Sequence, residues 1–395
     1  MGGTRIEAAL DDAKNVLVGS PDQRLGFDFF GSVVSDLPAN LSGTTVYLTG
    51  DISRFRGRVA GAARVFVIEE LSHDHDHSHE LVGLGRVPVR VGGVGVYYPR
   101  FFADSDYFRR ISSEHAFQTL TESVKPSKAH RTGIYLTPVD RHGDELRFHL
   151  LRCSTNLSGP TESFCPTDRH IVNALNEEAA AIFRDHAPLN HALAQIYNNT
   201  PAADGQKQTK AKISAHADKT KDMPLNGIMA FCTFYDALGK LTPLPDDAFD
   251  HGYKGKTGLT RLSFRLKEPV LGREGLLPEL SITLYPGSVF FMPLSTNRLY
   301  THEIQSSMLN AEMLPTRLGY VVRCSKTKAV YKGGNTYLEI AGQLVQMEPP
   351  TEEGMTALRE LYAAENRSDA LIDYGDRFRF SMNEGDYKAP DPKRD

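Results

Sequence analysis

The sequence contains no tryptophan, few cysteines, no long apolar run and no large charge of either sign. Its four cysteines among 395 residues are too few for a disulfide framework, and none forms a Cys-x-x-Cys pair, so reduced thiols are expected. No apolar stretch reaches the roughly eighteen residues that a membrane-spanning helix needs, so no membrane contact is predicted. The first residues lack the apolar run of a secretory signal, so we expect an intracellular protein, with nucleus and cytoplasm both open.

The charge balance excludes one class of function. Lysine and arginine together number 45 against 49 aspartates and glutamates, which gives a net charge of −4. A globally basic nucleic-acid binder is therefore excluded, whereas a local basic patch is not. Apolar residues make up 40% of the chain, which is enough for a sizeable core.

The pattern along the chain predicts one clear helix followed by many short strands. The helix covers residues 168–186, where Asp168 is placed to cap it and apolar residues recur with helical spacing. The predicted strands follow at 193–197, 227–235, 259–266, 280–284, 288–292 and 319–324. Such a series indicates an antiparallel sandwich or barrel.

The local structure of three other segments can also be predicted. A hairpin is predicted over residues 134–151, with its turn at 140–144. The histidine-rich stretch 72–80 is typical of a solvated loop, with metal binding as the alternative. A helix is expected at 352–364, followed by a frayed polar tail.

The segment with the most chemical information contains His216-Ala-Asp218. In an extended chain this spacing places an imidazole and a carboxylate on one side, which is two thirds of a facial triad of two histidines and one carboxylate. A second His-x-Asp, at His142 and Asp144, falls in the predicted turn and is explained by turn geometry. Downstream, an apolar strand after Gly287 leads to His302, which is a candidate third ligand.

Two arginines stand on the last predicted strand of this series. Arg317 and Arg323 are six residues apart, an even number, so both point to the same face. Unpaired guanidinium groups on an apolar strand are costly to bury. A dicarboxylate would pair with both, and the ligand that this implies is 2-oxoglutarate.

Four blocks together resemble a known family, the AlkB-type Fe(II)/2-oxoglutarate dioxygenases. They are residues 189–197, 212–219, 298–304 and 317–323, in the family's order, and the likeness covers about half of the chain. The run from His216 through Asp222 to Asn226-Gly227 is also similar to the related TET/JBP branch, and the sequence does not separate the two.

The resemblance implies roles for three groups of residues. Iron is held by His216, Asp218 and His302. The cosubstrate is bound by Arg317 at its distal carboxylate, by Arg323 near its 1-carboxylate, and by Tyr197 and Gln195, although Gln195 stands where the family usually has asparagine. The substrate is contacted by Asp222, Lys219 and Arg298.

The implied fold is α+β, an antiparallel double-stranded β-helix (jelly roll) with flanking helices. Its core is expected over 126–340 with an insertion at about 236–278, an N-terminal region of unknown role over 1–125, and a C-terminal helix and polar tail over 341–395.

The implied activity uses Fe(II), 2-oxoglutarate and O2 to hydroxylate a methyl group on a modified base of DNA or RNA. The alternative is the same chemistry on a protein side chain or a small molecule. Five lysines between 207 and 221 either contact phosphates or form a solvated loop.

Overall fold

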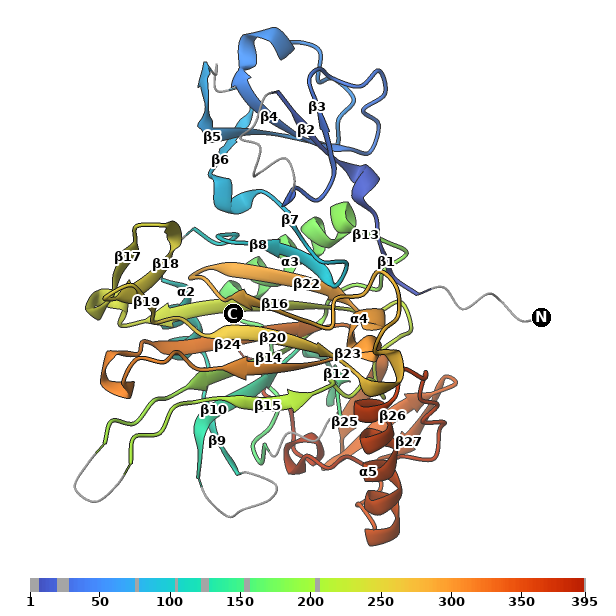
Figure 1. Ribbon diagram of the computed structural model, residues 1–395. Helices are drawn as coiled ribbons and strands as arrows, with labels where there is room; N and C mark the ends of the chain where they lie inside the picture. Colours follow the sequence, from blue (N-terminus) through green and yellow to red (C-terminus); the bar gives the residue numbers. More distant parts are fainter. Residues whose placement is uncertain are drawn as a thin grey trace.

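The computed structural model describes residues 7–19, 28–74, 78–103, 106–121, 128–152, 157–202 and 207–393. Figure 1 shows a small N-terminal lobe beside a larger body that is built mainly of strands. The histidine-rich stretch is only partly described, since residues 75–77 lie outside the described residues.

The largest element of the body is an eight-stranded antiparallel sheet, here called the large sheet. Its order is β7-β8-β22-β16-β24-β14-β10-β9. The strands are β7 (Val89–Val91), β8 (Gly95–Tyr98), β9 (Gln118–Thr121), β10 (Lys128–Leu136), β14 (His191–Tyr197), β16 (Ile228–Asp236), β22 (Ser288–Pro293) and β24 (Thr316–Arg323).

A four-stranded antiparallel sheet, the small sheet, packs against one face of the large sheet. Its order is β15-β23-β20-β21, with β15 (Ile213–His216), β20 (Arg261–Leu266), β21 (Glu279–Thr283) and β23 (Tyr300–Gln305). Phe231 and Phe290 of the large sheet meet Phe264 and Ile304 of the small sheet in one buried cluster. This is the two-layer packing expected of a β-sandwich, in which alternate residues of each strand face inward.

The chain passes repeatedly between the two sheets. β14 lies in the large sheet, β15 in the small, β16 in the large, β20 and β21 in the small, β22 in the large, β23 in the small and β24 in the large. Every strand predicted between 193 and 324 is confirmed, because their alternating apolar residues meet a core on at least one face.

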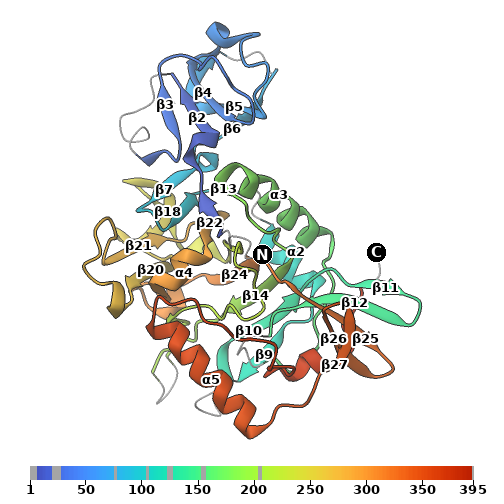
Figure 2. The ribbon, with the colours of Figure 1, turned by 90° about the vertical axis from the view of Figure 1, so that its right-hand side faces the viewer.

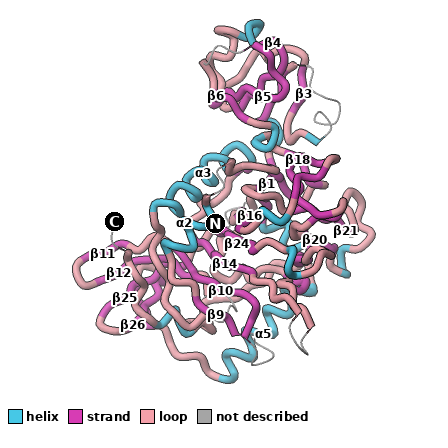
Figure 3. Tube along the Cα trace, turned by 90° about the vertical axis from the view of Figure 1, so that its left-hand side faces the viewer, coloured by secondary structure: helices cyan, strands magenta, loops and turns pink. Residues whose placement is uncertain are grey.

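Two helices cover the outer face of the large sheet, α2 (Tyr107–Glu114) and α3 (Pro166–Ile182) (Figure 3). Ile171 and Leu175 of α3 pack with Leu318 and Val322 of β24. The predicted helix is confirmed, but it spans residues 166–182 and not 168–186, because residues 183–184 form a short strand. Asp168 then lies in its first turn, where its carboxylate accepts the Cys165 backbone N–H at 2.7 Å.

The N-terminal lobe is a parallel sheet in the order β3-β2-β4-β5-β6. Its strands are β2 (Asn15–Val18), β3 (Ser32–Val34), β4 (Thr45–Asp51), β5 (Arg64–Asp74) and β6 (Glu80–Val82). Apolar clusters cover both of its faces, as parallel sheets require. Arg64 pairs with Glu178 of α3 at 2.8 Å and so ties the lobe to the body.

The lobe ends earlier than the sequence suggested. We expected a boundary near 125, but residues 89–98 already form two strands of the large sheet, and α2 and β9 follow within the body. The separate lobe therefore covers about residues 15–88, since residues 9–10 pair with strand β13 (Phe183–Arg184) of the body.

The remaining strands form smaller sheets. The C-terminal sheet has the order β11-β12-β25-β26-β27, with β11 (Asp140–His142), β12 (Glu145–Leu150), β25 (Thr327–Lys332), β26 (Asn335–Ile340) and β27 (Gln343–Gln346). The others are β17 (Thr242–Leu244), β18 (Asp247–Tyr253) and β19 (Lys256–Thr257), and the pair β1 (Ala9–Leu10) and β13 (Phe183–Arg184).

Short helices complete the described chain. They are α4 (Leu294–Leu299), α5 (Glu352–Arg367) and the 3-10 turns η1 (Asp12–Lys14), η2 (Ile52–Phe55), η3 (Leu84–Arg86), η4 (Leu238–Lys240), η5 (Glu268–Val270), η6 (Ala311–Met313) and η7 (Glu384–Tyr387). Within the described residues, no helix is both long and apolar enough to cross a membrane.

Two expectations about the chain's periphery need correction. The insertion is the three-stranded sheet at 242–257, because residues 261–266 belong to the small sheet. The tail after α5 is not frayed. Tyr374, Phe378 and Phe380 pack against Leu358 and Tyr362 of the helix in a buried cluster, and Figure 2 shows this segment running back along the body.

A buried ionic network joins α2, α3 and the tail. The His115 ring lies between two carboxylates, with Nδ1 2.8 Å from Glu162 and Nε2 2.7 Å from Asp168. Tyr320 donates to Asp168 at 2.9 Å, and Lys393 pairs with Glu162 at 2.8 Å. Burial opposes the charge on His115, but the hydrogen bonds to Asp168 and Glu162 prevail and raise its pKa to about 9.

This network predicts that stability falls as pH rises. A histidine whose folded pKa is raised from 6.5 to about 9 stabilises the fold fully below pH 6.5 and loses that contribution as pH passes 9. The contribution of His115 to the free energy of unfolding is about 3 kcal/mol, since one pKa unit corresponds to about 1.36 kcal/mol. Urea unfolding at pH 6 and pH 9.5 should show this loss in the wild type and not in His115→Gln. An equal loss of unfolding free energy in the wild type and the variant would contradict this role of His115.

Candidate metal centre

Three predicted ligands converge where the two sheets meet. His216 ends β15, Asp218 follows two residues later, and His302 lies on the neighbouring strand β23, directly opposite His216. Their ligand atoms all lie within 4.8 Å of one another. The Nε2 atoms of His216 and His302 lie 3.5 and 3.9 Å from Asp218 Oδ1, so all three face one point.

Both imidazoles are in a state that can bind a cation. His216 Nδ1 donates to the Ser214 carbonyl at 2.9 Å, which leaves Nε2 as the free lone pair toward Asp218. Burial, reinforced by the proximity of His216, lowers the pKa of His302 to about 3, so this ring is neutral. Its Nδ1 is buried and has no partner within the described chain.

Asp218 is held from two sides. Its Oδ2 accepts from Arg323 Nε at 2.8 Å and Nη2 at 2.6 Å. Its backbone N–H donates to Asn297 Oδ1 at 2.8 Å, and its carbonyl accepts from Asn297 Nδ2 at 2.9 Å. Burial alone would raise the pKa of Asp218, but Arg323 and the two histidines hold it well below its usual range.

The donor set fits a divalent iron ion. Two imidazoles and one carboxylate, with one carboxylate oxygen still turned toward the histidines, form a facial triad that leaves coordination positions open. Both Nε2 atoms converge on the same oxygen, Asp218 Oδ1, so a cation at this point would be within reach of all three side chains.

At the other end of β24 lies a buried cation, Arg317, for which the described residues supply no carboxylate partner. Arg317 is 5% exposed, its guanidinium stacks on the Tyr197 ring at 4.0 Å, and its Nε has no hydrogen-bond partner among the described residues. Tyr197 donates to Gln195 Oε1 at 2.9 Å. Gly319 leaves space here, since a Cβ would lie 2.9 Å from Arg317 Nη1. A guanidinium in this position suits a carboxylate, and we call Arg317 with Tyr197 and Gln195 the carboxylate pocket.

Arg323 lies beside the triad, where the structure pairs it with Asp218. Its expected place near the 1-carboxylate end of the cosubstrate stays a prediction. The two arginines share the inner face of β24, as their spacing predicted, but they serve the metal ligand and the carboxylate pocket separately.

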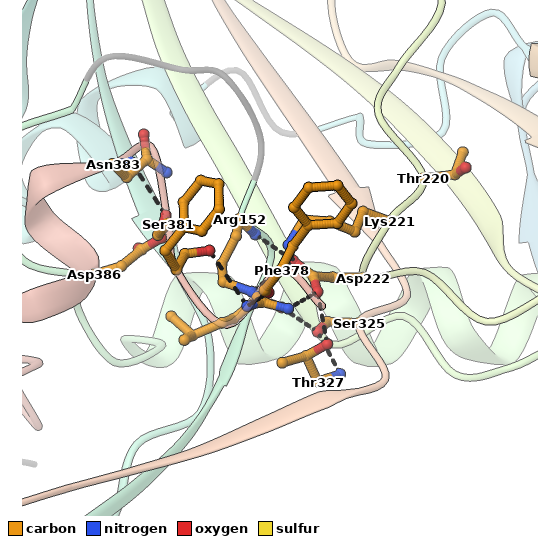
Figure 4. A network of polar contacts seen from close by, with 12 residues as sticks. Arg152, Thr220, Lys221, Asp222, Ser325, Thr327, Phe378, Ser381, Asn383 and Asp386 are labelled. Atoms are coloured by element: carbon orange, nitrogen blue, oxygen red, sulfur yellow. Dashed lines mark hydrogen bonds and ion pairs between the residues drawn. The ribbon is translucent and has the colours of Figure 1, made fainter. Parts of the chain in front are cut away.

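Asp222 belongs to a buried network rather than to an open substrate surface (Figure 4). Its Oδ1 accepts from Arg152 Nη2 at 2.7 Å and from Thr327 at 2.8 Å, and its Oδ2 accepts from the Arg152 backbone N–H at 2.7 Å. Arg152 also donates to the Phe378 carbonyl at 2.8 Å. Both carboxylate oxygens are therefore used within the protein, and this environment gives Asp222 a structural role.

The other substrate candidates also have protein partners. Lys219 lies over the Tyr362 ring and donates to the Tyr362 carbonyl at 3.2 Å. Arg298, on α4, pairs with Glu7. Neither arrangement places the cation on an open surface.

Other lysines of the predicted basic segment at 207–221 also have partners within the protein. Lys210 donates to the Ser307 carbonyl at 2.9 Å, and Lys221 is buried beside Asp222 at 3.4 Å. Only Lys207 and Lys212 of the five lysines are fully exposed.

Two residues near the centre were not found from the sequence. Asn297 holds the backbone of Asp218 from a helix 79 residues away, and no local pattern marks it. His191 lies opposite Arg323 in the β14–β24 register, is 1% exposed, and has an Nδ1 without a partner in the described chain. Its place at an inward position of β14, in step with Gln195 and Tyr197, was a usable signal.

The Asp218–Arg323 pair predicts a large asymmetry between mutants. Arg323→Met leaves a buried carboxylate without its cation, which costs about 3–5 kcal/mol. The double variant Asp218→Asn/Arg323→Met removes both charges and should recover much of that loss. Urea unfolding of the metal-free proteins measures both values. A single variant as stable as the wild type would show that the pair does not carry this energy.

Comparisons with known proteins give limited information. No protein-family model matches the chain, and no curated protein matches it. Among solved structures, a prolyl-4-hydroxylase from Pseudomonas putida is 12% identical, covering 58% of this chain and 86% of its own, with a TM-score of 0.31.

Two further structures give values in the same range. The non-heme alpha ketoglutarate dependent epimerase SnoN from nogalamycin biosynthesis is 12% identical, covering 60% of this chain and 81% of its own, with a TM-score of 0.32. OsALKBH1 is 15% identical, covering 55% and 91%, with a TM-score of 0.30. At such scores, the functional assignment depends on the residues of the site itself.

Proposed function

We propose that the chain is an Fe(II)- and 2-oxoglutarate-dependent dioxygenase with a double-stranded β-helix core. The observation that carries the proposal is the convergence of His216, Asp218 and His302 on one point. Two features support it. The strands pass alternately between the two sheets, as a jelly roll would require, and the buried Arg317, without a carboxylate partner among the described residues, lies on the same inner face as the centre.

When bound, the iron would supply coordination sites for 2-oxoglutarate and O2 and the oxidising chemistry that turns a C–H bond into C–OH, with succinate and CO2 as the other products. The residues of the chain hold and orient the reactants. Arg317, stacked on Tyr197, binds the distal carboxylate, and Gln195 orients the Tyr197 hydroxyl. Arg323 occupies Asp218 Oδ2, so only Oδ1 is directed to the metal.

For the substrate, we propose a methyl group on a modified base of DNA or RNA, removed by oxidative demethylation or oxidised further as in methylpyrimidine oxidation. The support is the resemblance of the four sequence blocks. We also propose an intracellular location. One observation favours the alternative, a protein side chain or a small molecule. Three of the five lysines expected to follow phosphates have partners within the protein.

The first test is succinate formation from 2-oxoglutarate with Fe(II) and O2. Replacing His216, Asp218 or His302 by alanine should abolish turnover, because each removes one of three ligands. His142→Ala is the matched control, since His142 begins the second His-x-Asp of the chain but lies exposed on β11. Full activity in any of the three ligand variants would overturn the assignment.

The same assay distinguishes the substrates. Succinate formation stimulated by one methylated DNA or RNA oligonucleotide, and lost in His216→Ala, supports the nucleic-acid proposal. Stimulation only by peptides or small molecules supports the alternative.

The carboxylate pocket gives an independent prediction. Arg317→Met should raise the KM for 2-oxoglutarate about 10- to 100-fold, since a hydrogen bond to a charged group contributes about 1.5–3 kcal/mol. Metal binding should change little, because Arg317 does not contact the triad. Arg141→Met, on exposed β11, is the control. An unchanged KM would place the cosubstrate elsewhere.

A further inference from the structure

The C-terminal helix ends against the turn that directly follows His216 and contains Asp218, two of the three candidate ligands. This turn comprises residues 217–220 and leaves β15 directly after His216. Helix α5 begins at Glu352 and ends at Arg367, nearly 150 residues further along the chain. No pattern in the sequence indicates that the two are in contact.

The first contact lies between the ligands themselves. The Ala217 backbone N–H donates to Asn366 Oδ1 at 2.8 Å. Ala217 is fully buried and lies beyond the end of β15, so its N–H has no strand partner to replace this acceptor. An unsatisfied buried N–H is costly, and the bond therefore fixes the peptide that separates His216 from Asp218.

The second contact holds the end of the turn. The Glu365 carboxylate accepts the Thr220 backbone N–H at 3.2 Å and the Thr220 hydroxyl. The same carboxylate accepts the Tyr374 hydroxyl at 2.6 Å, so the turn, the helix and the following tail share one acceptor. With Lys219 bound to the Tyr362 carbonyl, three of the four residues of the turn are tied to α5 by hydrogen bonds.

The helix end is itself anchored near the third ligand. Lys267 Nζ, which is buried, donates to the carbonyls of Glu365 at 2.7 Å and Ser368 at 3.1 Å. A cation at this position satisfies the last carbonyls of a helix. Lys267 follows directly after β20, whose Phe264 lies opposite His302 in the sheet. Helix α5 is thus fixed between β20, the strand next to His302, and the turn that follows His216 and contains Asp218.

We infer that Asn366, supported by Glu365, is a positioning residue of the metal centre. It sets the relative placement of His216 and Asp218 by holding the peptide between them. Asn297 holds the next peptide from the opposite side, through the Asp218 N–H. The inference rests on the proposed function, since it assigns the C-terminal helix to the same site.

The test is titration of the metal-free full-length protein with Co(II), followed by its ligand-field absorption. Asn366→Ala should weaken Co(II) binding about 10- to 100-fold, which is the usual effect of removing a group that orients a metal ligand, and should alter the absorption bands. Asn366→Asp keeps an oxygen at the same reach and should restore most of the affinity. Arg359→Ala, exposed on the same helix, is the control and should bind as the wild type does.

The outcomes are distinguishable. If the wild type binds Co(II) and Asn366→Ala binds it with the same affinity and spectrum, the positioning role is overturned and the proposed function stands. If the wild type itself binds no Co(II), the proposed function fails and the inference fails with it. Should Asn366→Ala not fold, Asn366→Leu, which fills the same volume without an acceptor, gives the same comparison.

Discussion

The buried ion pair between Asp218 and Arg323 is the interaction on which the rest of the site depends. It joins the end of β15, in the small sheet, to β24, in the large sheet, and so fixes the two layers where the ligands converge. Inside a protein either charge alone would be strongly unfavourable. Because Arg323 occupies one carboxylate oxygen, the other can face only His216 and His302.

One face of strand β24 packs in the core of the fold, and its other face contributes to the candidate site. Outward residues such as Leu318 and Val322 pack under α3, while Arg317 and Arg323 point inward at opposite ends of the strand. The two-residue period of a β-strand makes this division possible without any special backbone conformation. One end therefore holds a metal ligand, and the other offers a cation to a carboxylate.

The parts outside the two central sheets contribute unequally. The C-terminal segment reaches the site through α5 and through Arg152, which bridges Asp222 to the Phe378 carbonyl (Figure 4). The N-terminal lobe attaches instead to the far side of the body, through Arg64 and Glu178 on α3. The site is thus assembled from the central sheets and the last third of the chain.

The strands between 193 and 324, a helix over 168–186, the triad and the shared face of the two arginines were all predictable from the sequence. These features depend on periodicity and short spacing, which the regular backbone of a strand or helix translates into positions on one face. Three other features became visible only in the folded chain: Arg152 encloses Asp222 from 70 residues away, Arg323 pairs with Asp218, and the tail packs on α5. Such contacts join residues far apart in the chain, and each partner alone has the same local pattern as an exposed charged or polar residue.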